Sequence, residues 1–403
     1  MKKVRLGEIA EIRNGATPDT KNFDFWDGNI SWITPNDLSN NNSKYISKGE
    51  RSITEKGAKR ISPKPLPQNT VLLSTRAPIG YLAIASNDLY TNQGFKNIVI
   101  KNANEFSANY IYYYLSSVRE KLSYLGAGTT FKEISGNVIK QMTLFLPDHS
   151  TQQKIAAILS SLDDKIETNN KIASVLEKMM KEIYNYWFVQ FDFPDKNGKP
   201  YQASGGEMVY NPTLKREIPK GWAVKKLEDI FTITMGSSPK GHSLNENGNG
   251  IEFYQGSTDF GRLYPTIRVF TTEPVRFAKS QDILMSVRAP VGAMNIAMND
   301  CCIGRGLAAI HHESPLFAWY TMLTFKSYFD TFNGNGTTFG SLTSNNLKEQ
   351  LTVAPDKSIL QIFIEKTQSI GEKIKTITME NIQLTALRDF LLPLLMNGQA
   401  SVQ

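Results

Sequence analysis

The chain has 403 residues, enough for two or three domains that each bury a core. Hydrophobic residues make up 40% and charged residues 21%, and the net charge of +7 suits a polyanionic partner. No apolar run reaches the roughly 18 residues of a membrane-spanning helix, and residues 1–8 lack the apolar stretch of a signal peptide. The two cysteines, Cys301 and Cys302, are adjacent, which favours a cytoplasmic chain without a disulfide framework.

Two diverged copies of one unit follow each other along the chain. Residues 6–18 match 227–239, residues 71–94 match 283–306, and the Gly-Thr-Thr block at 126–131 returns at 334–339. The three blocks keep their order, and their offset shrinks along the chain, as expected when loops lose residues between copies. We therefore predict an internal repeat with an approximate twofold axis, which would let two identical partners bind one chain.

The globular part of each copy mixes strand and helix patterns. Residues 70–74 and 81–86 are short apolar runs on either side of a Pro/Gly turn, which predicts two strands. Residues 105–125 carry apolar side chains at helical spacing, and residues 317–332 take the same place in the second copy. The predicted class is therefore α/β, as a mixed α+β arrangement.

A long helix is predicted after each globular part. Both helices follow a proline, and Ser150 with Gln153 and Ser358 with Gln361 fit the S-x-x-Q capping box. A seven-residue repeat predicts a coiled coil of two antiparallel helices, with one globular part at each end. The alternative is that each helix packs only on its own globular part. The polar residues expected in the seam, where they would fix register, are Asn169, Asn381 and Arg388.

Together these features resemble the specificity (S) subunit of type I restriction–modification enzymes, the HsdS family. The resemblance covers essentially the whole chain. It is carried by four features: the opening at 6–18, the Arg-Ala-Pro turns at 76–78 and 288–290, the Gly-Thr-Thr blocks, and the entry into the long helix at 146–156. The resemblance implies target-recognition domains at 1–148 and 216–356. It also implies a central helix with linker at 149–215 and a distal helix at 357–403.

The resemblance also implies a function. Each globular domain would read one half of a bipartite site in double-stranded DNA, while the helices set the gap and dock two adenine methyltransferase (M) subunits. Those partners would bind S-adenosylmethionine, and restriction/translocase (R) subunits can join them. The chain itself would hold no cofactor and no metal, and would have no catalytic residue.

Candidate DNA contacts fall into two groups. Arg76, Arg288 and the Gly-Thr-Thr threonines recur in both copies, so we interpret them as backbone contacts or as structural residues. Residues that differ between the copies are better candidates for reading bases; any one of them could instead be solvated surface. The full set is Thr17, Lys21, Asn36, Asp37, Thr75, Arg76, Gln93, Lys96, Thr129, Thr130 and Lys132 in copy one, and Ser238, Lys240, Gln255, Arg262, Arg288, Arg305, Thr337 and Thr338 in copy two.

Other classes of protein fit the sequence less well. A single-chain DNA methyltransferase would need an Asn/Asp-Pro-Pro-aromatic segment, which residues 211–214 do not supply. Asp148 with Asp163–Lys165 imitates a nuclease motif, but we expect Asp163 and Asp164 to be solvated charges on the outer face of a helix. A coiled-coil adaptor that does not bind DNA would not explain two basic, differently looped globular parts. We expect Trp26, Trp32 and both cysteines to pack in cores.

Overall fold

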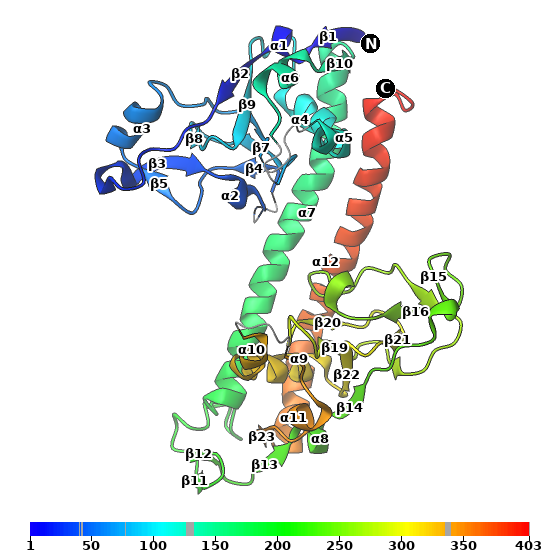
Figure 1. The fold of residues 1–403 in the computed structure, drawn as a ribbon. Coiled ribbons are helices and arrows are strands. Elements are labelled where there is room, and N and C mark those ends of the chain that lie inside the picture. The colour runs from blue at the N-terminus through cyan, green and yellow to red at the C-terminus, as the bar shows by residue number, and fades with distance from the viewer. Residues whose placement is uncertain (40, 42, 77, 126–132, 335–339, 403) are drawn as a thin grey trace. The chain divides into compact units, whose positions relative to one another are not determined.

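The computed structural model describes residues 1–39, 41, 43–76, 78–125, 133–334 and 340–402. The chain forms two compact units, the first of residues 1–172 with 379–403 and the second of residues 173–378 (Figure 1). The boundary cuts both long helices, α7 (His149–Tyr184) and α12 (Lys357–Met396), so each unit contains a segment of each. Among the described residues, no helix is both long and apolar enough to cross a membrane.

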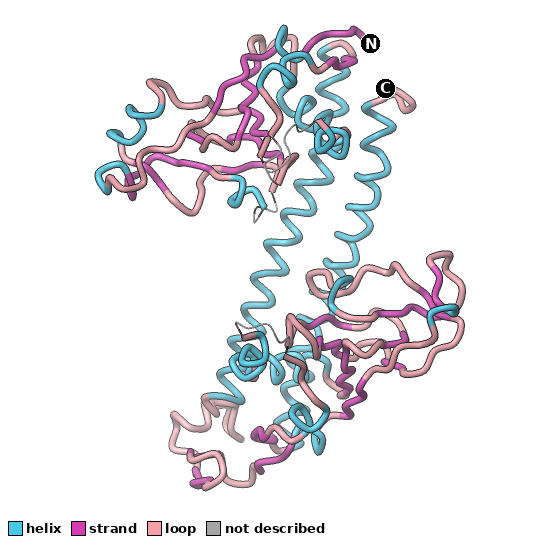
Figure 2. Tube along the Cα trace, viewed as in Figure 1, coloured by secondary structure: helices cyan, strands magenta, loops and turns pink. Residues whose placement is uncertain are grey.

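The first unit contains two main sheets, whose strands are magenta in Figure 2. The larger has the order β2-β9-β6-β7-β4 and the smaller β5-β3-β8, while β1 pairs with β10. The strands are β1 (Lys2–Arg5), β2 (Ala10–Asn14), β3 (Trp26–Ile33), β4 (Tyr45–Ile46), β5 (Ser52–Ile53), β6 (Val71–Ser74), β7 (Leu82–Ala85), β8 (Tyr90–Thr91), β9 (Phe95–Ile100) and β10 (Thr143–Leu146). The short helices are α1 (Leu6–Ile9), α2 (Pro35–Ser39), α3 (Glu55–Ile61), α4 (Ala108–Ser117), α5 (Arg119–Tyr124) and α6 (Gly136–Gln141).

The second unit repeats the central arrangement. Its sheets have the orders β14-β22-β19-β20 and β15-β17-β16-β21-β18, with the further pairs β13-β23 and β11-β12. The strands are β11 (Met208–Asn211), β12 (Arg216–Pro219), β13 (Ala223–Lys226), β14 (Thr232–Met235), β15 (Leu244–Asn245), β16 (Ile251–Tyr254), β17 (Phe270–Thr271), β18 (Phe277–Ala278), β19 (Ile283–Ser286), β20 (Met294–Ile296), β21 (Cys301–Ile303), β22 (Leu307–His311) and β23 (Leu351–Ala354). The short helices are α8 (Leu227–Ile230), α9 (Pro315–Thr324), α10 (Lys326–Asp330) and α11 (Ser344–Lys348).

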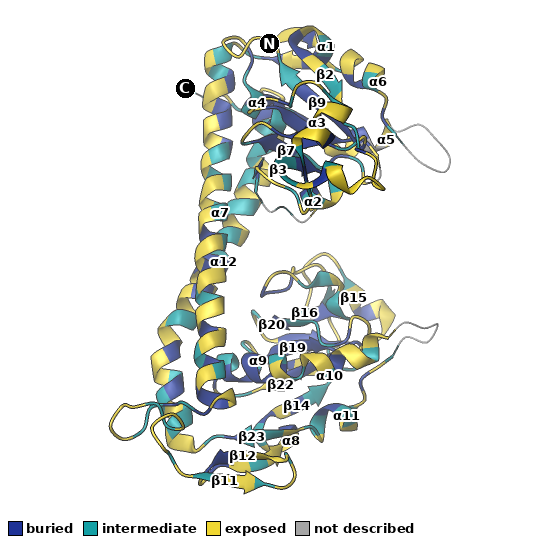
Figure 3. Ribbon diagram, turned by 90° about the vertical axis from the view of Figure 1, so that its left-hand side faces the viewer, coloured by how far each residue is buried: buried dark blue, intermediate teal, exposed yellow. Residues whose placement is uncertain are grey.

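The mixed class and the paired strands are confirmed, because β6 with β7 and β19 with β20 form antiparallel pairs at the repeated blocks. β6 and β19 are buried along their whole length, and β19 and β22 are dark in Figure 3. The helix predicted over 105–125 is divided into α4 and α5, because Val118 leaves the helical conformation at φ −109° and ψ 15°. Phe325 divides α9 from α10 at the same place in copy two, with φ −91° and ψ 7°.

The caps of the long helices differ from the prediction. Each helix begins one residue earlier than its expected capping serine, and the cap is an aspartate. Asp148 accepts hydrogen bonds from the backbone N–H of Thr151 at 3.0 Å and from its hydroxyl at 2.8 Å. Asp356 accepts from the backbone N–H of Ser358 at 2.8 Å and from its hydroxyl. These bonds lower the pKa of both carboxyls, and a carboxylate is further favoured at the positive end of the helix dipole.

Polar side chains join α7 to α12 within the first unit. The buried Asn169 amide donates to Asn381 Oδ1 at 2.9 Å and to Glu380 Oε2 at 2.8 Å. Farther toward the start of α7, Asp163 Oδ1 accepts from Arg388 Nη1 at 2.9 Å. Residue numbers fall on α12 as they rise on α7, so the two segments are antiparallel. The three predicted polar seam residues therefore lie between the helices.

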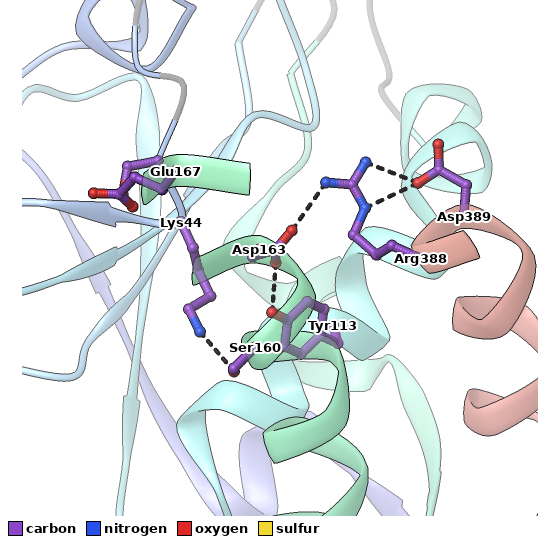
Figure 4. Close-up of polar contacts among 8 residues, drawn as sticks. Lys44, Tyr113, Ser160, Asp163, Glu167, Arg388 and Asp389 are labelled. Atoms are coloured by element: carbon purple, nitrogen blue, oxygen red, sulfur yellow. Dashed lines mark hydrogen bonds and ion pairs between the residues drawn. The ribbon is translucent and has the colours of Figure 1, made fainter. Parts of the chain in front are cut away.

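The prediction that Asp163 is a solvated charge is wrong. Its side chain is only 15% exposed, and it receives hydrogen bonds from both the Arg388 guanidinium and the Tyr113 hydroxyl (Figure 4). Burial, reinforced by the charge of Asp163, raises the pKa of Tyr113, so the phenol remains a donor. A sequence pattern identifies the helix face of a residue, but it does not show which charges another segment brings to that face.

Each unit has a core to which both long helices contribute. In the first unit Leu159 of α7 and Leu395 of α12 join the core of the globular part. In the second unit Tyr184 and Phe363 meet in an aromatic cluster, with Phe363 fully buried. The alternative in which each helix packs only on its own globular part is therefore wrong.

We expect Asp163→Ala to destabilise the protein by about 1–3 kcal/mol. The substitution leaves the Tyr113 hydroxyl without its acceptor and Arg388 without its interhelical partner. The matched control is Asp164→Ala on the same helix, where the side chain is exposed and a change below about 0.5 kcal/mol is expected. Urea unfolding measures both, and equal midpoints for the two variants would contradict the role given to Asp163.

Candidate nucleic-acid interface

The loop after β2 packs tightly against the loop between β8 and β9. Gly15 follows β2 and lies against the 91–94 loop, where a Cβ would come within 1.9 Å of Asn92 O, so only glycine fits. Three backbone hydrogen bonds fix the loop: Ala16 N to Thr91 O at 2.8 Å, Asn92 N to Ile33 O at 2.9 Å, and Thr75 N to Gly94 O at 2.8 Å. Gln93 is the exposed member of this loop, and the Thr17 hydroxyl donates to its Oε1.

The second unit repeats this arrangement atom for atom in its backbone. Gly236 lies against the 303–306 loop, and its Cβ would come within 2.2 Å of Gly304 O. The equivalent hydrogen bonds are Ser237 N to Ile303 O at 3.0 Å, Gly304 N to Tyr254 O at 2.8 Å, and Val287 N to Gly306 O at 2.9 Å. Arg305 is exposed in the place of Gln93, and its backbone N–H donates to Ser238 Oγ at 3.2 Å. We call this shared set of backbone bonds the loop frame.

Other predicted residues surround Gln93. A hollow of about 530 Å³ is lined by Asn36, Arg76, Tyr81 and Gln93, among others. Of these, Asn36, Arg76 and Gln93 are exposed, so amide and guanidinium groups face solvent in one place. Thr17 joins them through its bond to Gln93. In the second unit Ser238 and Gln255 lie together in the same way, with Ser238 Oγ donating to Gln255 Oε1 at 2.8 Å.

The two repeated arginines have different surroundings. Arg76 Nε lies 2.9 Å from Glu133 Oε2, and Lys96 Nζ lies 3.0 Å from the other oxygen of the same carboxylate. Partial burial opposes ionisation of Glu133, but the hydrogen bonds from Lys96 and Arg76 outweigh it and lower its pKa. Arg288 makes the equivalent backbone bridge to Ser341, which has no carboxylate. Within the described part of the chain, no polar group pairs with the exposed Arg288 guanidinium.

Three of the predicted contact residues make structural contacts within the fold. Lys96 is buried and pairs with Glu133. Thr75 is fully buried, and its hydroxyl and N–H both point at Gly94 O. The Asp37 carboxylate accepts from Thr34 and from the backbone N–H of Glu50, so it caps α2 and fixes the following loop. Residue type alone could not separate these from exposed polar residues.

The remaining predicted residues lie away from Gln93 and Arg305 or outside the residues that the structure describes. Lys21 and Lys240 are exposed on the loops that follow the glycine approach. Arg262 is exposed but pairs with Glu177 of α7 at 3.1 Å. Thr129, Thr130, Lys132, Thr337 and Thr338 lie outside the described residues.

The aromatic and sulfur side chains behave as expected. Trp26 and Trp32 are buried, and their rings meet edge to face at 5.0 Å. Cys301 and Cys302 are free and fully buried. The sequence reasoning missed Glu133, which neutralises two cations, and Asn92, whose side chain accepts from Gly94 N at 2.9 Å. A comparison of the copies offered one signal, since Glu133 is aligned with Ser341 beside an otherwise repeated arginine.

Known proteins resemble this chain over most or all of its length. The family described as type I restriction modification DNA specificity domain matches residues 1–178 and 219–386. The type I restriction enzyme MjaIX specificity subunit of Methanocaldococcus jannaschii is 34% identical over 420 residues, covering 100% of this chain and 94% of that protein. The putative MjaX specificity subunit of the same organism is 30% identical over 311 residues, covering 75% of this chain and 70% of that protein.

A solved structure supports the fold. The crystal structure of the type I restriction–modification S subunit from M. genitalium matches with a TM-score of 0.63 at 16% identity. The match covers 98% of this chain and 96% of that one. The arrangement found here, with two globular parts and two long helices, is therefore shared with a distant protein.

The Glu133 pair predicts a pH-dependent contribution to stability. A carboxyl with a lowered folded pKa stabilises above its unfolded pKa, near the ordinary 4.5, and loses this effect as pH falls through the folded value. We expect Glu133→Gln to cost about 1 kcal/mol at pH 7, a small value because the side chain is 33% exposed. The deficit should shrink below about pH 4.5.

Urea unfolding of Glu133→Gln from pH 7 to pH 3 measures this deficit, with Glu50→Gln as the control. Glu50 is exposed in the same globular part, and its neutralisation is expected to leave the free energy of unfolding unchanged from pH 7 to pH 3. A deficit that stays the same at every pH would show that the loss is steric and not due to the ion pairs.

Proposed function

The chain belongs to the type I restriction modification DNA specificity family, and from that premise we propose that it selects a bipartite DNA target for a multisubunit enzyme. Each globular part reads one half of the target. The chain performs no catalysis of its own. It directs adenine methyltransferase subunits, which bind S-adenosylmethionine, to the DNA that it has selected.

One observation carries the proposal: the same loop frame occurs in both units but presents different exposed side chains. The frame offers Gln93 in one copy and Arg305 in the other, on backbones fixed by equivalent hydrogen bonds. Amide and guanidinium groups are the side chains that pair bidentately with base edges in the major groove. Two loop frames with the same backbone hydrogen bonds but different exposed side chains suit two half-sites of different sequence.

Charge supports DNA as the partner. The net charge is +7, and the exposed Arg288, Lys21 and Lys240 lie on the loop-bearing segments of the two units. Basic groups of this kind contact phosphates and position a protein on the duplex without reading its sequence. Arg76 is less available, because Glu133 already neutralises it.

The long helices suit the remaining parts of the proposal. Each is continuous across the boundary between the two units, which supports a role for the helices in setting the gap between the two half-sites of the DNA. The internal repeat provides two similar docking surfaces on one chain, which suits two identical methyltransferase subunits. Restriction/translocase subunits join through these partners.

We expect the complex of this chain with its adenine methyltransferase partner to protect two short tracts of DNA separated by an unprotected gap. Affinity should fall at least 10-fold between 50 and 200 mM salt, because several phosphate contacts are lost to competing cations. Footprinting and a salt titration on one duplex give both results. Protection of a single contiguous tract would exclude the split-site proposal, and binding that is independent of salt would exclude the phosphate contacts.

A further inference from the structure

The 91–94 and 303–306 loops are equivalent positions at which the two units differ in one exposed residue. Each loop is tied to the strand-end glycine, to the preceding sheet and to the arginine turn by the same backbone bonds. Because three backbone hydrogen bonds hold each loop, its one exposed side chain extends from a defined position. Gln93 and Arg305 therefore stand in equivalent places on equivalent scaffolds.

The chemistry of Gln93 suits adenine. The Thr17 hydroxyl donates to Gln93 Oε1, which orients the amide and uses one of the two lone pairs of that oxygen. The second lone pair can accept from the N6 amino group of adenine, while the Gln93 amide N–H donates to N7. Thr17 is thus a positioning residue, and the amide makes the contact.

The chemistry of Arg305 suits guanine. Ser238 accepts from the backbone N–H of Arg305 and so holds the main chain, leaving the guanidinium to extend from the loop. No polar partner of the guanidinium is found among the residues that the structure describes, and the side chain is exposed. A planar guanidinium donates two parallel hydrogen bonds to guanine O6 and N7.

We propose that Gln93 and Arg305 are equivalent base-reading residues, Gln93 for an adenine in one half-site and Arg305 for a guanine in the other. The inference rests on the proposed function and adds to it which residue in each unit determines a base. It also explains why the loop frame is kept while these two residues differ. The shared residues hold the loop, and the variable residue on it reads the DNA.

The test exchanges the two residue types. Gln93→Arg and Arg305→Gln are made in the full chain and produced with the methyltransferase partner. The methylated sequence is then determined for the unchanged chain and for each variant. We expect Gln93→Arg to change one base in one half-site from adenine to guanine, and Arg305→Gln to make the reverse change in the other. The preference should shift by roughly 10- to 100-fold, with the opposite half-site unchanged.

Matched controls lie at the other end of β6 and β19, on turns that are also equivalent between the units. Gln68→Arg and Lys279→Gln change exposed side chains on these turns. The turns are equivalent because the backbone N–H of Gln68 donates to the Asp88 carboxylate, and that of Ser280 donates to the Asp300 carboxylate. Both controls should leave the methylated sequence as it is. Thr17→Val should weaken the preference for adenine without replacing it by another base.

Three results separate the possible failures. If the unchanged chain directs methylation to no bipartite sequence, the proposed function is wrong. If the unchanged chain gives a bipartite sequence that both exchanges leave unaltered, the proposed function stands and the base-reading assignment is overturned. If the exchanges weaken methylation of all sequences equally, Gln93 and Arg305 contact the DNA backbone, and the assignment is again overturned.

Discussion

The pairing of the two long helices is the interaction on which the rest of the structure depends. Neither core is complete with one helix: Leu159 and Leu395 enter the first, and Tyr184 and Phe363 enter the second. Each compact unit therefore takes one segment from the helix of the other copy. A tandem duplication that could have produced two independent domains has instead produced two that share their helices.

Polar groups in the helix pair limit how the two segments can combine. The Asn169–Asn381 bond and the Asp163–Arg388 ion pair are satisfied together only in one antiparallel register. A slip of one turn would leave the buried Asn169 amide without its partners and would part Arg388 from Asp163, so that its guanidinium would keep only Asp389 of its own helix. The register matters for the proposed function, in which the helix pair sets the spacer between the two half-sites.

Patterns that depend on the chain's own periodicity predicted the structure well. The repeat, the paired strands, the long helices and the polar seam residues follow from spacing that local structure imposes. The errors arose where a distant segment supplies the partner. Asp163 was expected in solvent, but Tyr113 and Arg388 contact it; the pairing of Lys96 with Glu133 was likewise not expected from the sequence. Within the candidate site, the sequence predicted Gln93 and Arg305 as separate DNA contacts. It did not predict the loop frame, whose backbone hydrogen bonds place these two residues at equivalent positions in the two units.

The central claim is that the helices set the distance between two half-sites, and lengthening both helices tests it most directly. Seven residues inserted after Ile172 in α7 and after Thr378 in α12 preserve the heptad and add about 10.5 Å to each helix. At about 3.4 Å per base pair, the gap between the methylated half-sites should grow by about three base pairs, with both half-sites unchanged. An unchanged gap, or half-sites of new sequence, would contradict the account.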